Sequence, residues 1–330
     1  MNTFVIAEAG ANHDRKFEQA LELIDTAKDA GADAVKFQTY SSETLYCKNT
    51  PDFAGYENVN KLIKDIELPR EWQKDLKTYC DDQNIEFMST PFDEKAVEEL
   101  VDIGVKRLKI AGFESTDFRF VEMVASAKLP LIVSIGIGFR DEHLPQLMHV
   151  CSKYTQDITL LHCNNAYPTP IGQANINKIK WLRRTTKHTG AKVGFSDHTV
   201  STLTPALAVA KGATTIEKHF TLDRFLDRKG PDHSFALEPQ ELSQMISNIR
   251  EAEKTLTDLT PNKLSKSEES FQYARRSVVS KTKIKEGDVL TKENITTKRP
   301  YDPANSIAAS EFGSILGRTA SRDYREDEMI

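Results

Sequence analysis

The chain has 330 residues, of which 39% are hydrophobic and 28% are charged, so it can bury a sizeable core and is not typical of a disordered protein. Its formal net charge of −5 lacks the basic excess of nucleic-acid-binding proteins. No charged and then apolar signal segment starts the chain, and no run of about 18 apolar residues occurs, so we expect no membrane partner.

Short apolar runs alternate with amphipathic stretches from the first residues onward, which is typical of βα units and a parallel sheet. We predict strands at residues 4–7, 34–38, 85–89, 107–111, 131–134, 158–162, 192–195 and 215–218. Helical periodicity is clear over 17–30 and 70–83, and Gly31, Gly104 and Gly212 each mark a helix end just before a strand. Eight consecutive repeats favour a closed (β/α)₈ barrel over an open doubly wound sheet.

A change in composition follows the eighth repeat, where the residues become rich in Lys, Ser, Thr and Asp, as in linkers. We predict a barrel domain over 1–256, a linker over 257–270 and a small β-rich domain over 271–330. Short β segments are expected at 276–279 and 289–290. Because about 60 residues form a marginal core, this small domain is expected to dock on another surface.

The four cysteines are Cys47, Cys80, Cys151 and Cys163. They share no CxxC spacing and lie too far apart in the sequence to suggest a disulfide framework or a zinc ribbon. We interpret them as reduced thiols of a cytoplasmic protein.

Polar residues gather where the predicted strands end, and the active site of a barrel lies at the carboxyl ends of its strands. These residues are Glu8, Lys36, Gln38, Ser89, Thr90, Lys109, Ser134, His162, Asn164, Asn165, Ser196, Asp197, His198, Glu217 and His219. A lone buried carboxylate is more often structural, but the clustering favours a site. Ser196, Asp197 and His198 cannot form a hydrolase triad, because three consecutive residues at a strand end cannot line up as nucleophile, base and orienting group.

Two histidines, His198 and His219, end the seventh and eighth strands, which are neighbours in a barrel. Their imidazoles can converge on one divalent ion and leave positions open for substrate and water. A lone histidine usually has a structural role, but two histidines on adjacent strand ends make a metal-binding role the more favoured one. Because no cysteine adjoins either in the sequence, Mn²⁺ or Mg²⁺ is favoured over structural Zn²⁺.

Two lysines, Lys36 and Lys109, end two other strands. A lysine directed into a barrel mouth is unfavourable unless an anion meets it, so the pair predicts a pocket for phosphate and carboxylate groups. The alternative is that each stem packs while its amine reaches solvent. Lys218 has the opposite side-chain parity from its neighbours and is expected to point away from the mouth. Gly136-Ile137-Gly138 follows the fifth strand and resembles a phosphate-cradling turn, although glycine is common there for steric reasons alone.

Several short motifs are spread along the chain. They are Ala7-Glu8-Ala9-Gly10-Ala11-Asn12-His13, Val35-Lys36-Phe37-Gln38-Thr39, Ser89-Thr90-Pro91-Phe92, His162-Cys163-Asn164-Asn165-Ala166-Tyr167-Pro168-Thr169-Pro170, Phe195-Ser196-Asp197-His198-Thr199, Ile216-Glu217-Lys218-His219-Phe220 and Gly230-Pro231-Asp232-His233. By these motifs, and over nearly its whole length, the chain resembles the sialic acid synthases and their relatives that make other nonulosonic acids.

That family condenses phosphoenolpyruvate with the open-chain aldehyde of an N-acetylated amino sugar, and the resemblance implies the same substrates here. By matching motif, the implied ligands of a divalent metal, Mn²⁺ or Mg²⁺, are His198 and His219. The implied phosphoenolpyruvate pocket consists of Lys36, Thr90, Lys109, Asn165 and Ser196. The implied catalytic residues, close to the sugar and the reacting carbons, are Glu8, Gln38, Tyr167 and Asp232.

The C-terminal segments Ile284-Lys285-Glu286-Gly287 and Lys298-Arg299-Pro300 resemble the antifreeze-like (SAF) domain that these enzymes place on the barrel of a partner subunit. The resemblance implies a domain-swapped homodimer in which Arg299 reaches the partner's sugar site. Without the resemblance, an exposed arginine before a proline would be an ordinary surface residue.

Two departures from the sialic pattern leave the acceptor sugar open. Lys109-Ile110-Ala111-Gly112-Phe113-Glu114 replaces the usual Lys-Ile-Gly-Ser-Gly-Glu or Lys-Ile-Pro-Ser-Gly-Glu, which removes a serine that would contact phosphate and is closer to the pseudaminic acid branch. Tyr301-Asp302-Pro303-Ala304 replaces a glycine-rich continuation after Arg299-Pro300. Gly230-Pro231-Asp232-His233 instead matches the sialic and legionaminic branches, so N-acetylneuraminate, legionaminate and pseudaminate synthases all fit.

Two other functions stay open on the sequence alone. One is a related synthase that condenses phosphoenolpyruvate with a sugar phosphate, against which the C-terminal domain argues. The other is a non-catalytic sugar-binding barrel, which would be expected to lack a metal histidine or a strand-end lysine, and none is missing.

Overall fold

The computed structural model describes residues 2–53, 55–225, 230–256 and 264–330. The chain divides into two compact units, Met1–Thr257 and Asp258–Ile330. Residues 257–263 of the predicted linker lie outside the described residues, and the rest of that linker contains the short helix α10 (Lys266–Glu269).

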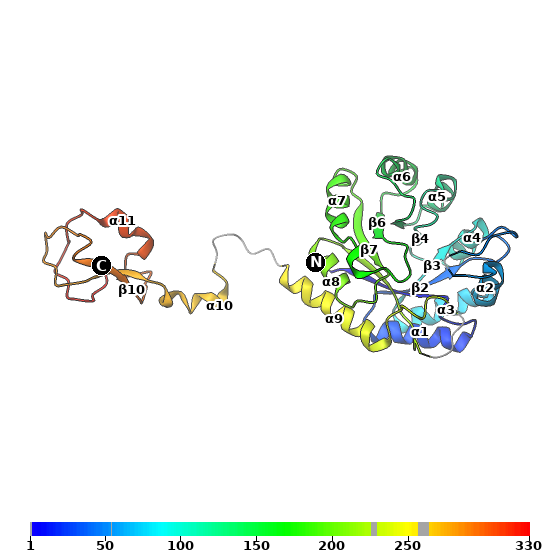
Figure 1. Cartoon of the computed structure of the whole chain (residues 1–330), viewed down its shortest axis with the longest axis horizontal. Coiled ribbons are helices and arrows are strands. Elements are labelled where there is room, and N and C mark those ends of the chain that lie inside the picture. Colours follow the sequence, from blue (N-terminus) through cyan, green and yellow to red (C-terminus); the bar gives the residue numbers. More distant parts are fainter. Residues whose placement is uncertain (1, 54, 226–229, 257–263) are drawn as a thin grey trace. The chain divides into compact units, whose positions relative to one another are not determined.

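Eight parallel strands form the first unit (Figure 1). They are β1 (Phe4–Gly10), β2 (Ala34–Thr39), β3 (Glu86–Pro91), β4 (Leu108–Ile110), β5 (Leu131–Ile135), β6 (Ile158–Cys163), β7 (Lys192–Asp197) and β8 (Thr215–His219). They follow the hydrogen-bonded order β3-β2-β1-β8-β7-β6-β5-β4, and β3 and β4 also contact each other, which completes the ring. The predicted eight-stranded barrel is confirmed.

Helices surround the strands of this unit (Figure 1). They are α1 (Phe17–Asp29), α2 (Val59–Ile66), α3 (Gln73–Gln83), α4 (Glu94–Asp102), α5 (Phe118–Ala125), α6 (His143–Ser152), α7 (Asn177–Thr185), α8 (Thr204–Ala210) and α9 (Pro239–Thr255). Each follows from an apolar stripe; α1, for example, buries Ala20, Leu23, Ile24 and Ala27 at helical spacing. No helix in the described part of the chain is long and apolar enough to cross a membrane.

The interior of the barrel changes from apolar to polar along the strands. Its apolar layer consists of Ile6, Ala34, Met88, Ile132 and Leu161. Because side chains alternate along a strand, the next inward positions are two residues further on. They are Glu8, Lys36, Thr90, Ser134 and Cys163, all at one end of the barrel. The apolar layer therefore forms the floor beneath a polar pocket.

The second unit is small and has its own core. Strands β9 (Ser277–Ser280) and β10 (Ile295–Lys298) pair antiparallel, and α11 (Phe312–Ile315) lies near the C-terminus. The core contains Val278, Ile284, Leu290, Ile295 and Ile315. The segment predicted at 276–279 is confirmed as β9, and the one at 289–290 forms a single bridge between Val289 and Thr319.

Candidate active site

A pocket opens at the carboxyl ends of the barrel strands. Its lining residues are Glu8, Lys36, Gln38, Thr90, Phe92, Lys109, Ala111, Gly112, Ser134, Cys163, Tyr167, Ser196, His198, Glu217 and His219. Most of the residues predicted for the site are therefore brought together here.

The strand-end candidates Ser89, His162, Asn164 and Asp197 do not line this pocket, and neither do three of the residues that the resemblance implies. The side-chain oxygen Oδ1 of Asn165 accepts a hydrogen bond of 2.9 Å from the Ile137 amide, above the end of β5. Asp232 lies at the rim, with its Oδ2 3.4 Å from Nδ1 of His219. Arg299 is exposed and belongs to the second unit, so the barrel by itself does not contain it.

Directly above the apolar floor, the pocket contains a buried cluster of two lysines and two carboxylates. Lys36 Nζ lies 2.6 Å from Glu8 Oε2 and 3.6 Å from Glu217 Oε2, and donates a hydrogen bond of 2.9 Å to Thr90 Oγ1. Lys109 Nζ lies 3.3 Å from Glu217 Oε1. Both lysines are almost completely buried, which excludes the alternative that their amines reach solvent. Paired charges of this kind are tolerated in an interior only because each has a partner.

The two carboxylates of this cluster have opposite electrostatic environments. Burial raises the pKa of Glu8, and the charge of Lys36 offsets this only in part. Burial would also raise the pKa of Glu217, but Lys109 and Lys36 outweigh it and hold that pKa well below its usual range. Glu217 is therefore the ionised counter-ion of the lysines, while Glu8 holds a proton more readily than Glu217 does.

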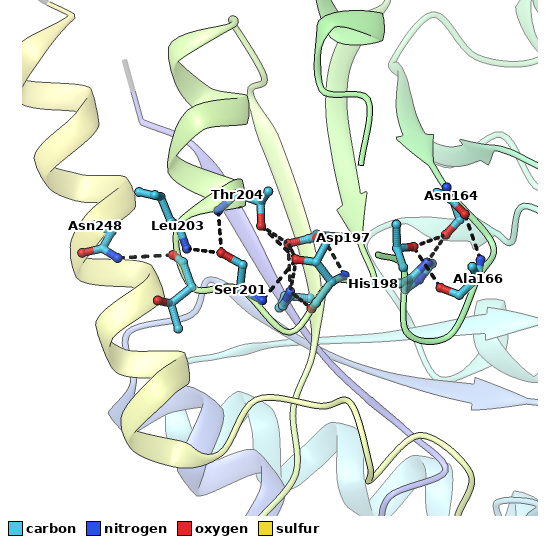
Figure 2. Close-up of polar contacts among 12 residues, drawn as sticks. Asn164, Ala166, Asp197, His198, Ser201, Leu203, Thr204 and Asn248 are labelled. Atoms are coloured by element: carbon cyan, nitrogen blue, oxygen red, sulfur yellow. Dashed lines mark hydrogen bonds and ion pairs between the residues drawn. The ribbon is translucent and has the colours of Figure 1, made fainter. Parts of the chain in front are cut away.

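The two histidines have adjacent imidazoles, with ring centroids 5.3 Å apart. Nδ1 of His198 lies 2.6 Å from the Asn164 carbonyl oxygen (Figure 2), and because a carbonyl only accepts, Nδ1 carries the hydrogen and Nε2 keeps its lone pair. Burial, followed by the neighbouring His219, lowers the pKa of His198 to about 3, so its ring is neutral. A neutral imidazole with a free lone pair is a metal ligand.

His219 differs from His198 in its surroundings. Its Nδ1 is buried and has no hydrogen-bond partner among the described residues; the 3.4 Å approach of Asp232 does not supply one. Burial would lower the pKa of His219, but the carboxylates of Asp232 and Glu8 outweigh it, so the pKa is raised. The negative charges of Asp232 and Glu8 favour the protonated ring of His219. The same charges would also attract a cation to this part of the pocket.

These donors fit a divalent ion held by few protein groups. Within the ranges that the structure describes, no three His, Cys, Asp or Glu side chains are arranged to hold a metal together. An ion at His198 and His219 would therefore complete its coordination with water and substrate, which is the open arrangement typical of catalytic metal sites.

Three aromatic side chains pack beside the two imidazoles, and we call them the aromatic wall: Phe113, Tyr167 and Phe235, of which Tyr167 lines the pocket itself. Tyr167 packs over His198 with ring centroids 4.2 Å apart, and Phe113 stacks on Tyr167 at 6.5 Å. Phe113 is 55% exposed, so part of its ring faces solvent. The wall gives the outer part of the site an apolar character.

Sequence reasoning gave no role to two carboxylates of this region. Glu217 was recognised as a strand-end residue, but its pairing with both lysines depends on strands distant in the sequence. Burial raises the pKa of Glu114 to about 7, and its Oε2 atom has no hydrogen-bond partner in the described chain. The only sequence signal for Glu114 is its place just after β4, next to Phe113.

Comparisons with known proteins identify the family of the chain. The model of the NeuB family matches residues 23–260, and that of the SAF domain matches residues 275–330. The chain belongs to the NeuB family. The expected resemblance to the sialic acid synthases and the expected antifreeze-like domain are both confirmed.

Relatives of this NeuB family member match over almost the whole chain. The N,N'-diacetyllegionaminic acid synthase of Campylobacter jejuni is 38% identical, over 99% of this chain and 98% of that one. A pseudaminic acid synthase of Campylobacter jejuni is 33% identical, over 99% and 95% of the two chains. The crystal structure of an N-acetylneuraminic acid synthetase from Leptospira borgpetersenii superposes with a TM-score of 0.74 at 33% identity, covering 82% of this chain and 90% of that one.

Proposed function

We propose that this chain is a nonulosonic acid synthase that condenses phosphoenolpyruvate with the open-chain aldehyde of an N-acetylated amino sugar. The proposal rests on one observation: two buried lysines and two adjacent imidazoles line the same pocket of a NeuB family barrel. Relatives named for unphosphorylated acids are 33–38% identical to this chain, against 29% for the human N-acetylneuraminate-9-phosphate synthase, which favours an acceptor without phosphate.

The phosphoenolpyruvate end of the site is formed by Lys36 and Lys109. Their buried ammonium groups would meet the phosphate and the carboxylate, with hydroxyl and amide groups as further donors. Those donors would be Thr90, Ser196 and Asn165. The serine missing near Gly112 is not replaced by Ser115, because its hydroxyl is buried and donates to the Gly112 carbonyl oxygen. Phosphate binding then depends more strongly on the lysines.

The reaction forms a carbon–carbon bond between the methylene carbon of phosphoenolpyruvate and the aldehyde carbon of the sugar. A divalent ion, Mn²⁺ or Mg²⁺, held by His198 and His219 would polarise the aldehyde carbonyl. Glu8, oriented by a 2.8 Å hydrogen bond from Gln38, would take the proton of the water that adds to the middle carbon, and a proton would pass to the former aldehyde oxygen, which becomes a hydroxyl group. Cleavage of the carbon–oxygen bond then releases phosphate. Tyr167 and Asp232 would position the sugar beside the imidazoles.

The acceptor that fits the aromatic wall carries a second acetamido group. Phe113 and Tyr167 present apolar surface where a sugar with only hydroxyl groups would leave its polar atoms unpaired. A relative with 38% identity is named for a diacetylated product, which points the same way. We therefore infer a diacetamido sugar as the preferred acceptor.

The experiment is a phosphate-release assay with phosphoenolpyruvate, Mn²⁺ and matched acceptors that carry one or two acetamido groups. We expect release with both and the higher kcat/KM with two. A preference for one acetamido group would refute the acceptor class and leave the synthase reaction standing. No release with any acceptor would refute the synthase.

A further inference from the structure

An ion pair lies directly behind the two imidazoles. Asp197 and Lys218 are partners in the register of β7 and β8, and each immediately precedes one of the two histidines in the sequence. Lys218 Nζ lies 2.8 Å from Asp197 Oδ2, and both side chains are about 1% exposed. The prediction that Lys218 points away from the mouth is confirmed, since it does not line the pocket, but its amine is buried and not in solvent.

The pair holds the backbone on both sides of His198. Asp197 accepts hydrogen bonds from the Thr199 amide at 2.9 Å and from the Thr199 and Thr204 hydroxyls at 3.1 Å each. Lys218 also donates to the Thr199 carbonyl oxygen. The residues before and after His198 are therefore both attached to the strand that carries His219.

The rest of the loop after β7 is fixed as well, as Figure 2 shows. Ser201 Oγ accepts hydrogen bonds from the amides of Leu203 and Thr204, and Asn248 of α9 donates to the Thr202 carbonyl oxygen at 3.2 Å. Lys218 connects this loop to β8, through its hydrogen bonds to Thr199 and its ion pair with Asp197 at the end of β7.

Packing alone does not explain a charged pair at this place. The neighbouring residues of the same strands with outward-facing side chains are Val193, Phe195 and Ile216, which belong to the apolar core between strands and helices. A buried ion pair rarely stabilises a fold more than apolar residues of similar volume. Its advantage is geometric, because it fixes two strand ends in one relative position.

We propose that Asp197 and Lys218 are positioning residues that set the separation of the His198 and His219 imidazoles and thereby the affinity of the site for a divalent ion. This inference rests on the metal-dependent synthase proposed above. Groups that orient metal ligands commonly change metal affinity about 10–100-fold when they are removed.

The test compares the single variants Asp197→Asn and Lys218→Met with the double variant. Each single change leaves one buried charge unpaired, so both should lower the urea midpoint. The double variant has no unpaired charge and should regain most of the wild-type midpoint. Its affinity for Mn²⁺, measured without substrates by the electron paramagnetic resonance of free Mn²⁺, should stay at least about tenfold lower than that of the wild type.

The matched control is the ion pair between Glu86 and Arg107, 2.6 Å apart where β3 and β4 begin. The double variant Glu86→Gln with Arg107→Met should change the urea midpoint and leave Mn²⁺ affinity unchanged. If the Asp197 and Lys218 double variant does not fold, Lys218→Arg keeps a buried cation but changes the group that holds Thr199, and should weaken Mn²⁺ binding.

Wild-type Mn²⁺ affinity in a folded double variant, or in Lys218→Arg, would show that the pair serves folding alone and would overturn the proposal. Phosphoenolpyruvate binding is measured by calorimetry on the same proteins. A wild-type protein that binds phosphoenolpyruvate but not Mn²⁺ would overturn the metal site, and the positioning role with it. A wild-type protein that binds neither phosphoenolpyruvate nor Mn²⁺ would overturn the proposed function.

Discussion

In this pocket, two side chains of the same type have different surroundings, which shift their pKa values in opposite directions. Glu8 has a raised pKa and Glu217 a lowered one, although both face Lys36. His198 is neutral, whereas His219 lies beside Asp232 and favours positive charge. When the pKa values of two groups of the same type are shifted in opposite directions, one group can exchange a proton while the other keeps its charge state.

The lysines give the first prediction at this scale. Lys36→Met or Lys109→Met keeps most of the side-chain volume and removes the charge. Loss of a buried ionic partner should weaken phosphoenolpyruvate binding by about 2–5 kcal/mol, as measured by calorimetry. The control is Lys192→Met, which removes an exposed ion pair with Asp157 and should have no effect. Unchanged affinity in both pocket variants would argue decisively against this pocket.

A second prediction concerns His162, which lies behind the pocket. Its Nε2 lies 2.9 Å from the Ala174 carbonyl oxygen, and burial lowers its pKa to about 4 from 6.5. The folded state therefore binds fewer protons than the unfolded state between these values, so its contribution is present above pH 6.5 and is lost as pH falls toward 4.

In His162→Gln, the decrease in unfolding free energy across this window should shrink by up to about 3 kcal/mol, measured by urea titrations at several pH values. An identical pH dependence in wild type and His162→Gln would contradict the assigned environment of His162.

Much of the pocket could be predicted at the residue scale because strand parity is a local property. Glu8, Lys36 and Thr90 follow from counting two residues beyond an apolar inward position. The Asp197 and Lys218 pair could not be predicted, since its partners lie on different strands and on the outer face. The roles of Glu217 and Glu114 likewise depend on burial that no local pattern reports.

Among the elements, the ends of the barrel strands were predicted to within two residues except for β1, which ends at Gly10 and not at residue 7. They are covered on both faces, so they read as continuous apolar runs. Several other elements were not predicted, and two of them show the physical reasons. Strand β10 has one large apolar residue, Ile295, among polar ones, and α2 is a short helix after the left-handed Asn58, with no long periodic stretch to reveal it.

The loop after β5 gives the prediction at this scale. A methyl group on Gly136 would lie 1.9 Å from Oδ1 of Asn165, so Gly136→Ala must displace that side chain from the phosphoenolpyruvate end of the site. Loss of one hydrogen bond to a charged ligand should weaken binding by about 1.5–3 kcal/mol with little change in the urea midpoint.

The control for this loop is Gly172→Ala, whose added methyl group meets no atom of the described chain within 4 Å. Its phosphoenolpyruvate affinity should equal that of the wild type. Equal affinity in Gly136→Ala would show that Asn165 does not contact phosphoenolpyruvate.

For the whole molecule, the question is what the SAF domain contributes. We propose that it acts across a homodimer, with Arg299 completing the sugar site of the partner. Arg299→Ala should then lower kcat/KM for the sugar about tenfold or more and leave phosphoenolpyruvate affinity unchanged. Mixed with His198→Ala, it should regain activity, because one heterodimer site has both an intact barrel and an intact Arg299. Absence of rescue despite proven subunit exchange would mean that Arg299 serves its own barrel or none.

The central claim is a condensation in which phosphoenolpyruvate loses its phosphate by carbon–oxygen cleavage. The most direct measurement uses phosphoenolpyruvate labelled with ¹⁸O at the bridging oxygen, the diacetamido acceptor and Mn²⁺, followed by mass spectrometry of both products. The pocket described above predicts that the label leaves with phosphate and that the new keto acid is unlabelled. Label retained in the keto acid, or no keto acid at all, would contradict it.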